Sequence, residues 1–156
     1  MISERRRALL DRYREGHLAV VDALAGATDA ELDAVPGSGE WSARMVVHHL
    51  ADSEMTSAIR LRRLLAEDRP VLGAYDEEEF ARRLHYDRPL DASLEVLRAV
   101  RAATAELVER LGDAEWAREG THGDSGRYSV DDWLEIYAAH AHDHADQIRR
   151  ARASAT

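Results

Sequence analysis

Residues 129–152, SVDDWLEIYAAHAHDHADQIRRAR, have the pattern of one long amphipathic helix near the end of the chain. Ser129 followed three residues later by Asp132 predicts a capped helix start. Large apolar residues then recur at steps of three and four and predict one buried face: Trp133, Ile136, Tyr137 and Ile148. A helix with this much apolar surface needs other helices to cover it.

Three histidines interrupt this predicted helix. His140 and His144 are four residues apart, about 400° of helical rotation, so their rings lie one turn apart on the same side. His142 lies about 200° around from His140 and should face away. The buried face of the helix therefore carries two imidazoles, each with a polar nitrogen that needs a partner.

Working outward, the same periodicity predicts three further long helices. They cover about residues 3–25, 42–67 and 91–111, with shorter helical turns at 28–31 and 76–84. Ser42 and Asp91 are the expected N-caps. Residues 112–127 are rich in glycine and polar side chains and are expected to be irregular. No run of alternating apolar residues suggests strands, so the sequence predicts an all-α four-helix bundle formed by one domain, residues 1–156.

Composition narrows the function. The 156 residues include no cysteine, so disulfides are excluded and a metal would need nitrogen or oxygen ligands. A net charge of -9 argues against nucleic acid as a partner. No apolar run reaches the roughly 18 residues of a membrane span, and no secretory signal follows the first residues. We therefore expect a cytoplasmic protein without membrane contact.

A divalent metal ion would satisfy the two buried imidazoles, because their nitrogen lone pairs are good ligands. The alternative is that both histidines bond to carbonyl groups or lie at the bundle surface. A third ligand must come from another helix, and His48 and His49 are the candidates. Periodicity alone does not choose between them.

Two segments resemble the DinB/YfiT-like superfamily. The first is residues 41–54, WSARMVVHHLADSE, and the second is residues 137–148, YAAHAHDHADQI. The resemblance implies an up-down four-helix bundle with a long crossover connection. It also implies one divalent metal ion per chain, zinc or nickel, held by His49, His140 and His144. Here His49 is chosen because it directly precedes the leucine of the family's His-Leu-x-Asp motif.

The resemblance further implies a metal-dependent enzyme. Our first expectation is transfer of a low-molecular-weight thiol of the bacillithiol type to an electrophilic substrate. The alternatives are a hydrolase using metal-bound water, and a non-catalytic stress-related protein with a vestigial site. Several family members are homodimers, and we expect the same here. Gln147 and Asp52 are candidates to orient the ligands. Glu54 and Gln147 stand where related proteins often carry histidine, which leaves the substrate open.

Overall fold

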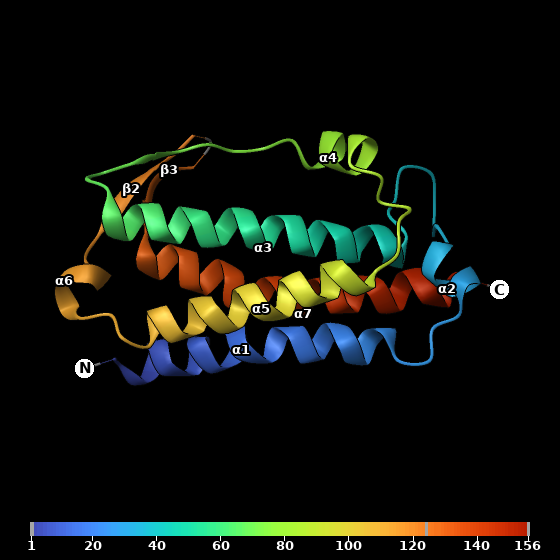
Figure 1. Cartoon of the computed structure of the whole chain (residues 1–156), viewed down its shortest axis with the longest axis horizontal. Coiled ribbons are helices and arrows are strands. Elements are labelled where there is room, and N and C mark those ends of the chain that lie inside the picture. The colour runs from blue at the N-terminus through green and yellow to red at the C-terminus, as the bar shows by residue number, and fades with distance from the viewer. Residues whose placement is uncertain (1, 124, 156) are drawn as a thin grey trace.

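Four long helices form the body of the molecule. The computed structural model describes residues 2–123 and 125–155, which contain the long helices α1 (Glu4–Leu24), α3 (Ala43–Ala66), α5 (Asp91–Val108) and α7 (Val130–Ala153). In Figure 1 they lie side by side along the long axis of the molecule. The expected four-helix bundle is confirmed.

The bundle has an up-down-down-up order. Following the chain in Figure 1, α1 and α7 run in one direction, whereas α3 and α5 both run in the other. Because α3 and α5 are parallel neighbours, the chain must return the full length of the bundle between them. Residues 67–90 make this return as the expected long crossover. It passes over α3 and contains β1 (Val71–Leu72) and α4 (Glu77–Arg83).

A three-stranded sheet, which the sequence did not predict, closes one end of the bundle. β1 pairs in parallel with β2 (Glu119–His122), and β2 pairs antiparallel with β3 (Gly126–Ser129). The short helix α6 (Asp113–Trp116) precedes the hairpin. The sheet ties the start of the crossover to the segment that leads into α7, so two connections that are distant in sequence brace each other.

Most predicted helix ends lie within two residues of the observed ones. The short helix α2 (Asp29–Asp33) begins with the expected capping box at Thr28, and Ser42 and Ser129 cap α3 and α7. Asp91 is an exception, because it is the first residue of α5 while Leu90 holds the cap position without a side-chain hydrogen bond. Its carboxylate instead lies at the positive end of the helix dipole. The third helix also ends at Val108, earlier than expected.

The core consists of two apolar clusters with a polar layer between them. Tyr13, Leu64 and Trp133 belong to the cluster nearer the sheet, and Val46 and Ile148 to the other. Between the two, by position along the helices, the charged side chains of Glu54 and Arg101 are almost fully buried and form an ion pair of 2.8 Å. Charge in this layer costs free energy unless it is paired, so each of the two side chains depends on the other.

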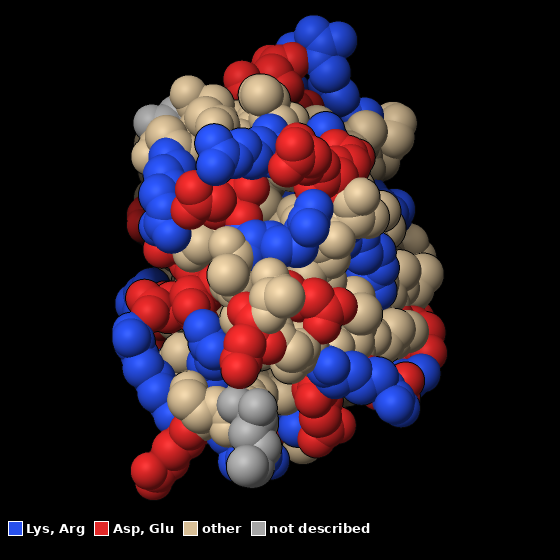
Figure 2. All heavy atoms as spheres, turned by 90° about the vertical axis from the view of Figure 1, so that its left-hand side faces the viewer, with Lys and Arg blue, Asp and Glu red and all other residues tan. Residues whose placement is uncertain are grey.

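The surface mixes charges of both signs. Figure 2 shows the end of the bundle formed by α6 and the hairpin, where basic and acidic side chains alternate and neither forms a continuous field. Ion pairs join helices here, such as Arg6 with Asp131 at 2.7 Å. Within the described residues, no helix is long and apolar enough to cross a membrane.

Candidate metal centre

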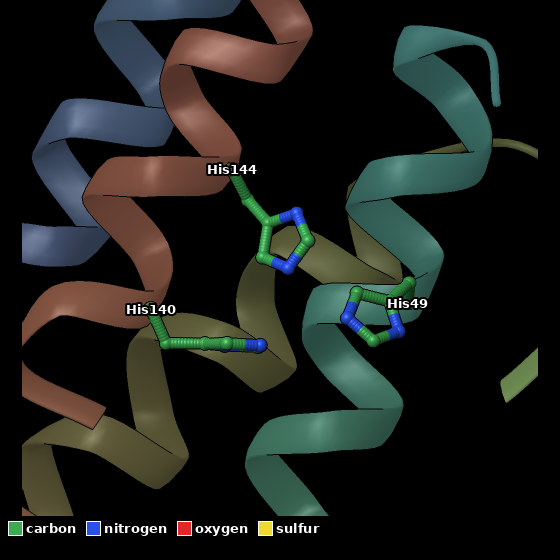
Figure 3. Close-up of side chains that lie close together, drawn as sticks. All are labelled: His49, His140 and His144. Atoms are coloured by element: carbon green, nitrogen blue, oxygen red, sulfur yellow. The ribbon is translucent and has the colours of Figure 1, made fainter. Parts of the chain in front are cut away.

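Three imidazoles meet between α3 and α7. His140 and His144 project from successive turns of α7 toward His49 on α3, as Figure 3 shows. Ring centroids lie 4.5 Å apart for His140 and His144, 4.7 Å for His49 and His144, and 5.5 Å for His49 and His140. One ring nitrogen from each residue can be chosen so that all three lie within 4.8 Å of one another.

His49 is positioned by the start of α3. The Ser42 side chain accepts a hydrogen bond from the Met45 backbone and begins the helix, which brings His49 to its second turn. Trp41, just before the cap, packs its ring 5.0 Å from the His49 ring. His49 is 1% exposed, and its Nδ1 has no hydrogen-bond partner among the described residues. Figure 3 shows that the other ring nitrogen of His49 turns toward His140 and His144, so this is the nitrogen available to a metal.

His48 differs from His49 in this respect. Its Nε2 donates to the Arg88 carbonyl at 2.9 Å, and its Nδ1 lies 2.7 Å from the Ser93 hydroxyl. Both ring nitrogens are therefore occupied within the protein, and burial lowers the pKa of His48 so that it stays neutral. His48 is a satisfied core histidine and His49 is not. The two are adjacent in sequence, yet only His49 has a nitrogen free for a metal.

Gln147 orients His144. The Gln147 Oε1 accepts a hydrogen bond from the His144 Nδ1 at 2.7 Å, so the remaining lone pair of His144 is on Nε2. This is the kind of contact that fixes the ring of a metal ligand. His142 lies on the other side of α7, as expected, where its Nε2 donates to the Arg12 carbonyl of α1.

The electrostatics favour three neutral rings. Burial lowers the pKa of His49 to about 4 and that of His140 to about 2, with the neighbouring imidazoles adding to the effect. Burial also lowers the pKa of His144. Neutral imidazole is the form that binds a metal. One nitrogen of each neutral ring lies within 4.8 Å of the other two, so the donor set fits a divalent ion.

The centre opens to solvent beside His144. A pocket of about 490 Å³ is lined there by His144, Gln147, Trp41, Glu77 and Glu78, among others. Glu77 comes from the first turn of α4, which the crossover carries, and its charge acts on His144. Sequence reasoning did not find this glutamate, because no helical spacing relates α4 to α7.

Two further acidic residues of α3 have partners within the protein. The Asp52 carboxylate accepts a hydrogen bond from the Tyr86 hydroxyl of the crossover at 2.6 Å. Glu54, where related proteins often carry histidine, is fully buried and pairs with Arg101. Ile136 was predicted on the buried face of α7 and is 48% exposed, so that prediction was wrong.

The fold and the three-histidine cluster together define a class, the helical bundles with a candidate metal centre between two helices. Comparison with known proteins places the chain within that class. The family model described as "DinB superfamily" matches residues 9–148. The chain therefore belongs to the DinB superfamily.

Similar proteins agree with this assignment. A protein of Oceanobacillus iheyensis named "Putative metal-dependent hydrolase" is 36% identical over 118 residues, covering 76% of this chain and 69% of its own length. "Putative metal-dependent hydrolase YfiT" of Bacillus subtilis is 34% identical over 124 residues, or 78% of this chain and 69% of its own. A solved structure of YfiT superposes with a TM-score of 0.88 at 29% identity. It covers 95% of this chain and 86% of that one, and its title describes "an unusual four-helix bundle topology".

Proposed function

We propose that this protein is a metal-dependent enzyme in which His49, His140 and His144 hold one divalent ion. The observation that carries the proposal is the meeting of three neutral imidazoles, one nitrogen of each lying within 4.8 Å of the other two, with His144 oriented by Gln147. The names of the similar proteins, which call them metal-dependent, support it. Zinc and nickel are the metals to test first.

The residues around the proposed metal ion have distinct roles. Three imidazoles leave part of the ion's coordination open, which is typical of catalytic sites rather than structural ones. A divalent ion bound there supplies Lewis-acid chemistry. Gln147 keeps the His144 ring in place, Trp41 shields His49 from water, and the pocket beside His144 admits the substrate.

Hydrolysis is the reaction that the names of the similar proteins favour. Thiol transfer, our first expectation from the sequence resemblance, is the second candidate. It requires a thiol cosubstrate, for which the pocket of about 490 Å³ beside His144 is the expected place. The chain has no cysteine, so a reacting sulfur would have to come from that cosubstrate.

One set of assays separates the two reactions. The purified protein is loaded with zinc or nickel and tested on p-nitrophenyl esters without thiol, and on monochlorobimane with bacillithiol. The proposal expects turnover in one assay, its loss on chelation, and its loss in His144→Ala. Metal should also raise the melting temperature, because a ligand that binds only the folded state stabilises it. A wild-type protein that retains no metal and melts unchanged with zinc or nickel would contradict the proposal.

A further inference from the structure

Arg60 connects the crossover to the His140 side of the candidate metal centre. Its Nη1 donates to the Tyr137 hydroxyl at 3.4 Å, and the Tyr137 ring packs 5.5 Å from the His140 ring. Its Nη2 donates to the Gly73 carbonyl in the crossover at 2.7 Å. Arg60 also lies on nearly the same side of α3 as His49, about 16 Å further along the axis. Helical side chains lean toward the N-terminus, so that of Arg60 leans toward His49.

The charge of Arg60 has no counterion within the described residues. Five other arginines of this chain present their Nε and Nη2 edge to both oxygens of a carboxylate: Arg6 to Asp131, Arg44 to Asp33, Arg63 to Glu67, Arg82 to Glu79 and Arg98 to Glu95. In Arg60 the same edge meets one carbonyl, and its Nε is buried without a partner. A half-buried guanidinium in this state favours an anion beside it.

Two tyrosines add donors to the same place. The Tyr75 hydroxyl is buried beside Ser53, and it lies close enough to Tyr137 for the two hydroxyls to influence each other's ionisation. Burial raises the pKa of Tyr75 to about 12 and also raises that of Tyr137, so both keep their protons at neutral pH. The Arg60 cluster, meaning Arg60, Tyr75 and Tyr137, therefore offers hydrogen-bond donors and one positive charge.

We propose that the Arg60 cluster binds a carboxylate group of a substrate whose other end reaches the candidate metal centre. The planar guanidinium edge matches the two oxygens of a carboxylate, as its five counterparts in this chain show. A surface pocket of about 380 Å³, lined by Arg60, Arg63 and Gly73 among others, gives access from solvent. The incoming carboxylate replaces the Gly73 carbonyl on Nη2. The inference rests on the proposed function and makes Arg60 a specificity determinant.

Matched ligands test the inference without assuming a reaction. Binding of dicarboxylates from glutarate to suberate to the zinc-loaded protein is measured by calorimetry, beside monocarboxylates of equal length. One carboxylate can bind the ion while the other reaches Arg60. We expect one dicarboxylate to bind about tenfold more tightly than its monocarboxylate, as a charged hydrogen-bonded pair would give.

Single-residue variants test whether Arg60 causes the preference for a dicarboxylate over a monocarboxylate. In Arg60→Gln the affinity ratio should fall to about one, with zinc content unchanged. Arg63→Gln is the matched control, because Arg63 lines the same pocket but is already paired with Glu67, and it should keep the full ratio. A ratio near one at every length in the wild type, or a ratio that survives in Arg60→Gln, would overturn the inference.

A protein that takes up no zinc would contradict the proposed function instead. The carboxylate site is then judged on the metal-free protein by the melting temperature with added adipate. A rise that disappears in Arg60→Gln but not in Arg63→Gln would support the site on its own, and no rise in the wild type would overturn it.

Discussion

His48 and His49 are neighbours in sequence with different chemistry. The helical pattern could not choose between them, because the choice depends on what each ring meets in three dimensions. Arg88 and Ser93, which occupy the nitrogens of His48, belong to the crossover and to α5. Only the family resemblance pointed to His49 from the sequence. By contrast, the relation between His140 and His144 could be predicted from spacing alone, since both lie on one helix.

Gln147 provides a prediction at the same scale. Gln147→Ala removes the acceptor that holds the His144 ring, so metal affinity should fall about tenfold or more. Competition with a chelator of known affinity measures the change. Asp146→Ala is the matched control, since Asp146 is an exposed neighbour that pairs with Arg149. Equal weakening in both variants would mean that the Gln147 contact is incidental.

Asp52→Asn should leave metal affinity unchanged in the same chelator competition, because the Asp52 carboxylate accepts its hydrogen bond from Tyr86.

At the level of elements, one guanidinium joins all four long helices. Arg101 of α5 donates to Glu54 of α3, to the Tyr13 carbonyl of α1 and to the Tyr137 carbonyl of α7. From helical spacing alone, either Val100 or Arg101 can face the core. Periodicity shows which positions are buried, but it does not show that a charged residue will find partners on three other helices.

Breaking this pair should be costly. Arg101→Met leaves Glu54 buried without its cation, so the free energy of unfolding should fall by about 3–5 kcal/mol. Adding Glu54→Gln to Arg101→Met should recover part of the loss, because it removes the unpaired charge. Denaturant titration of both single variants and the double variant measures the coupling. Purely additive losses would show that the two side chains do not act as a pair.

Gly16 makes room for the same guanidinium. A Cβ at this position would lie 2.4 Å from the Arg101 Nη1 and 2.8 Å from the Ala141 Cβ. Gly16→Ala gains about 1 kcal/mol of helix propensity but forces α1 away from α7, so we expect a net loss of about 1–3 kcal/mol. Thermal and denaturant unfolding measure it, with the exposed Glu15→Ala on the same helix as a control. An alanine variant as stable as the wild type would contradict this packing.

At the scale of the whole molecule, the four-helix bundle could be predicted because its long helices carry clear apolar periodicity. The sheet could not, since β1 has two residues and β2 and β3 four each, too short for an alternating pattern. The parallel relation of α3 and α5 also has no local signal. It follows from where the crossover runs, and this came only from the resemblance.

The expected homodimer stays a prediction of that resemblance. Size-exclusion chromatography with light scattering should give twice the 17.5 kDa mass of the chain at micromolar concentration. The metal-loaded and metal-free forms are compared so that assembly and metal binding are separated. A mass of one chain across the concentration range would contradict the expectation without affecting the metal centre, whose three histidines all come from one chain.

Metal content of single histidine variants tests the central claim most directly. The wild type and five alanine variants, at residues 48, 49, 140, 142 and 144, are loaded with zinc, desalted and analysed by mass spectrometry of the element. We predict about one ion per chain in the wild type, His48→Ala and His142→Ala, and a large loss in His49→Ala, His140→Ala and His144→Ala. Equal retention in all five variants, or no zinc in the wild type, would contradict the account.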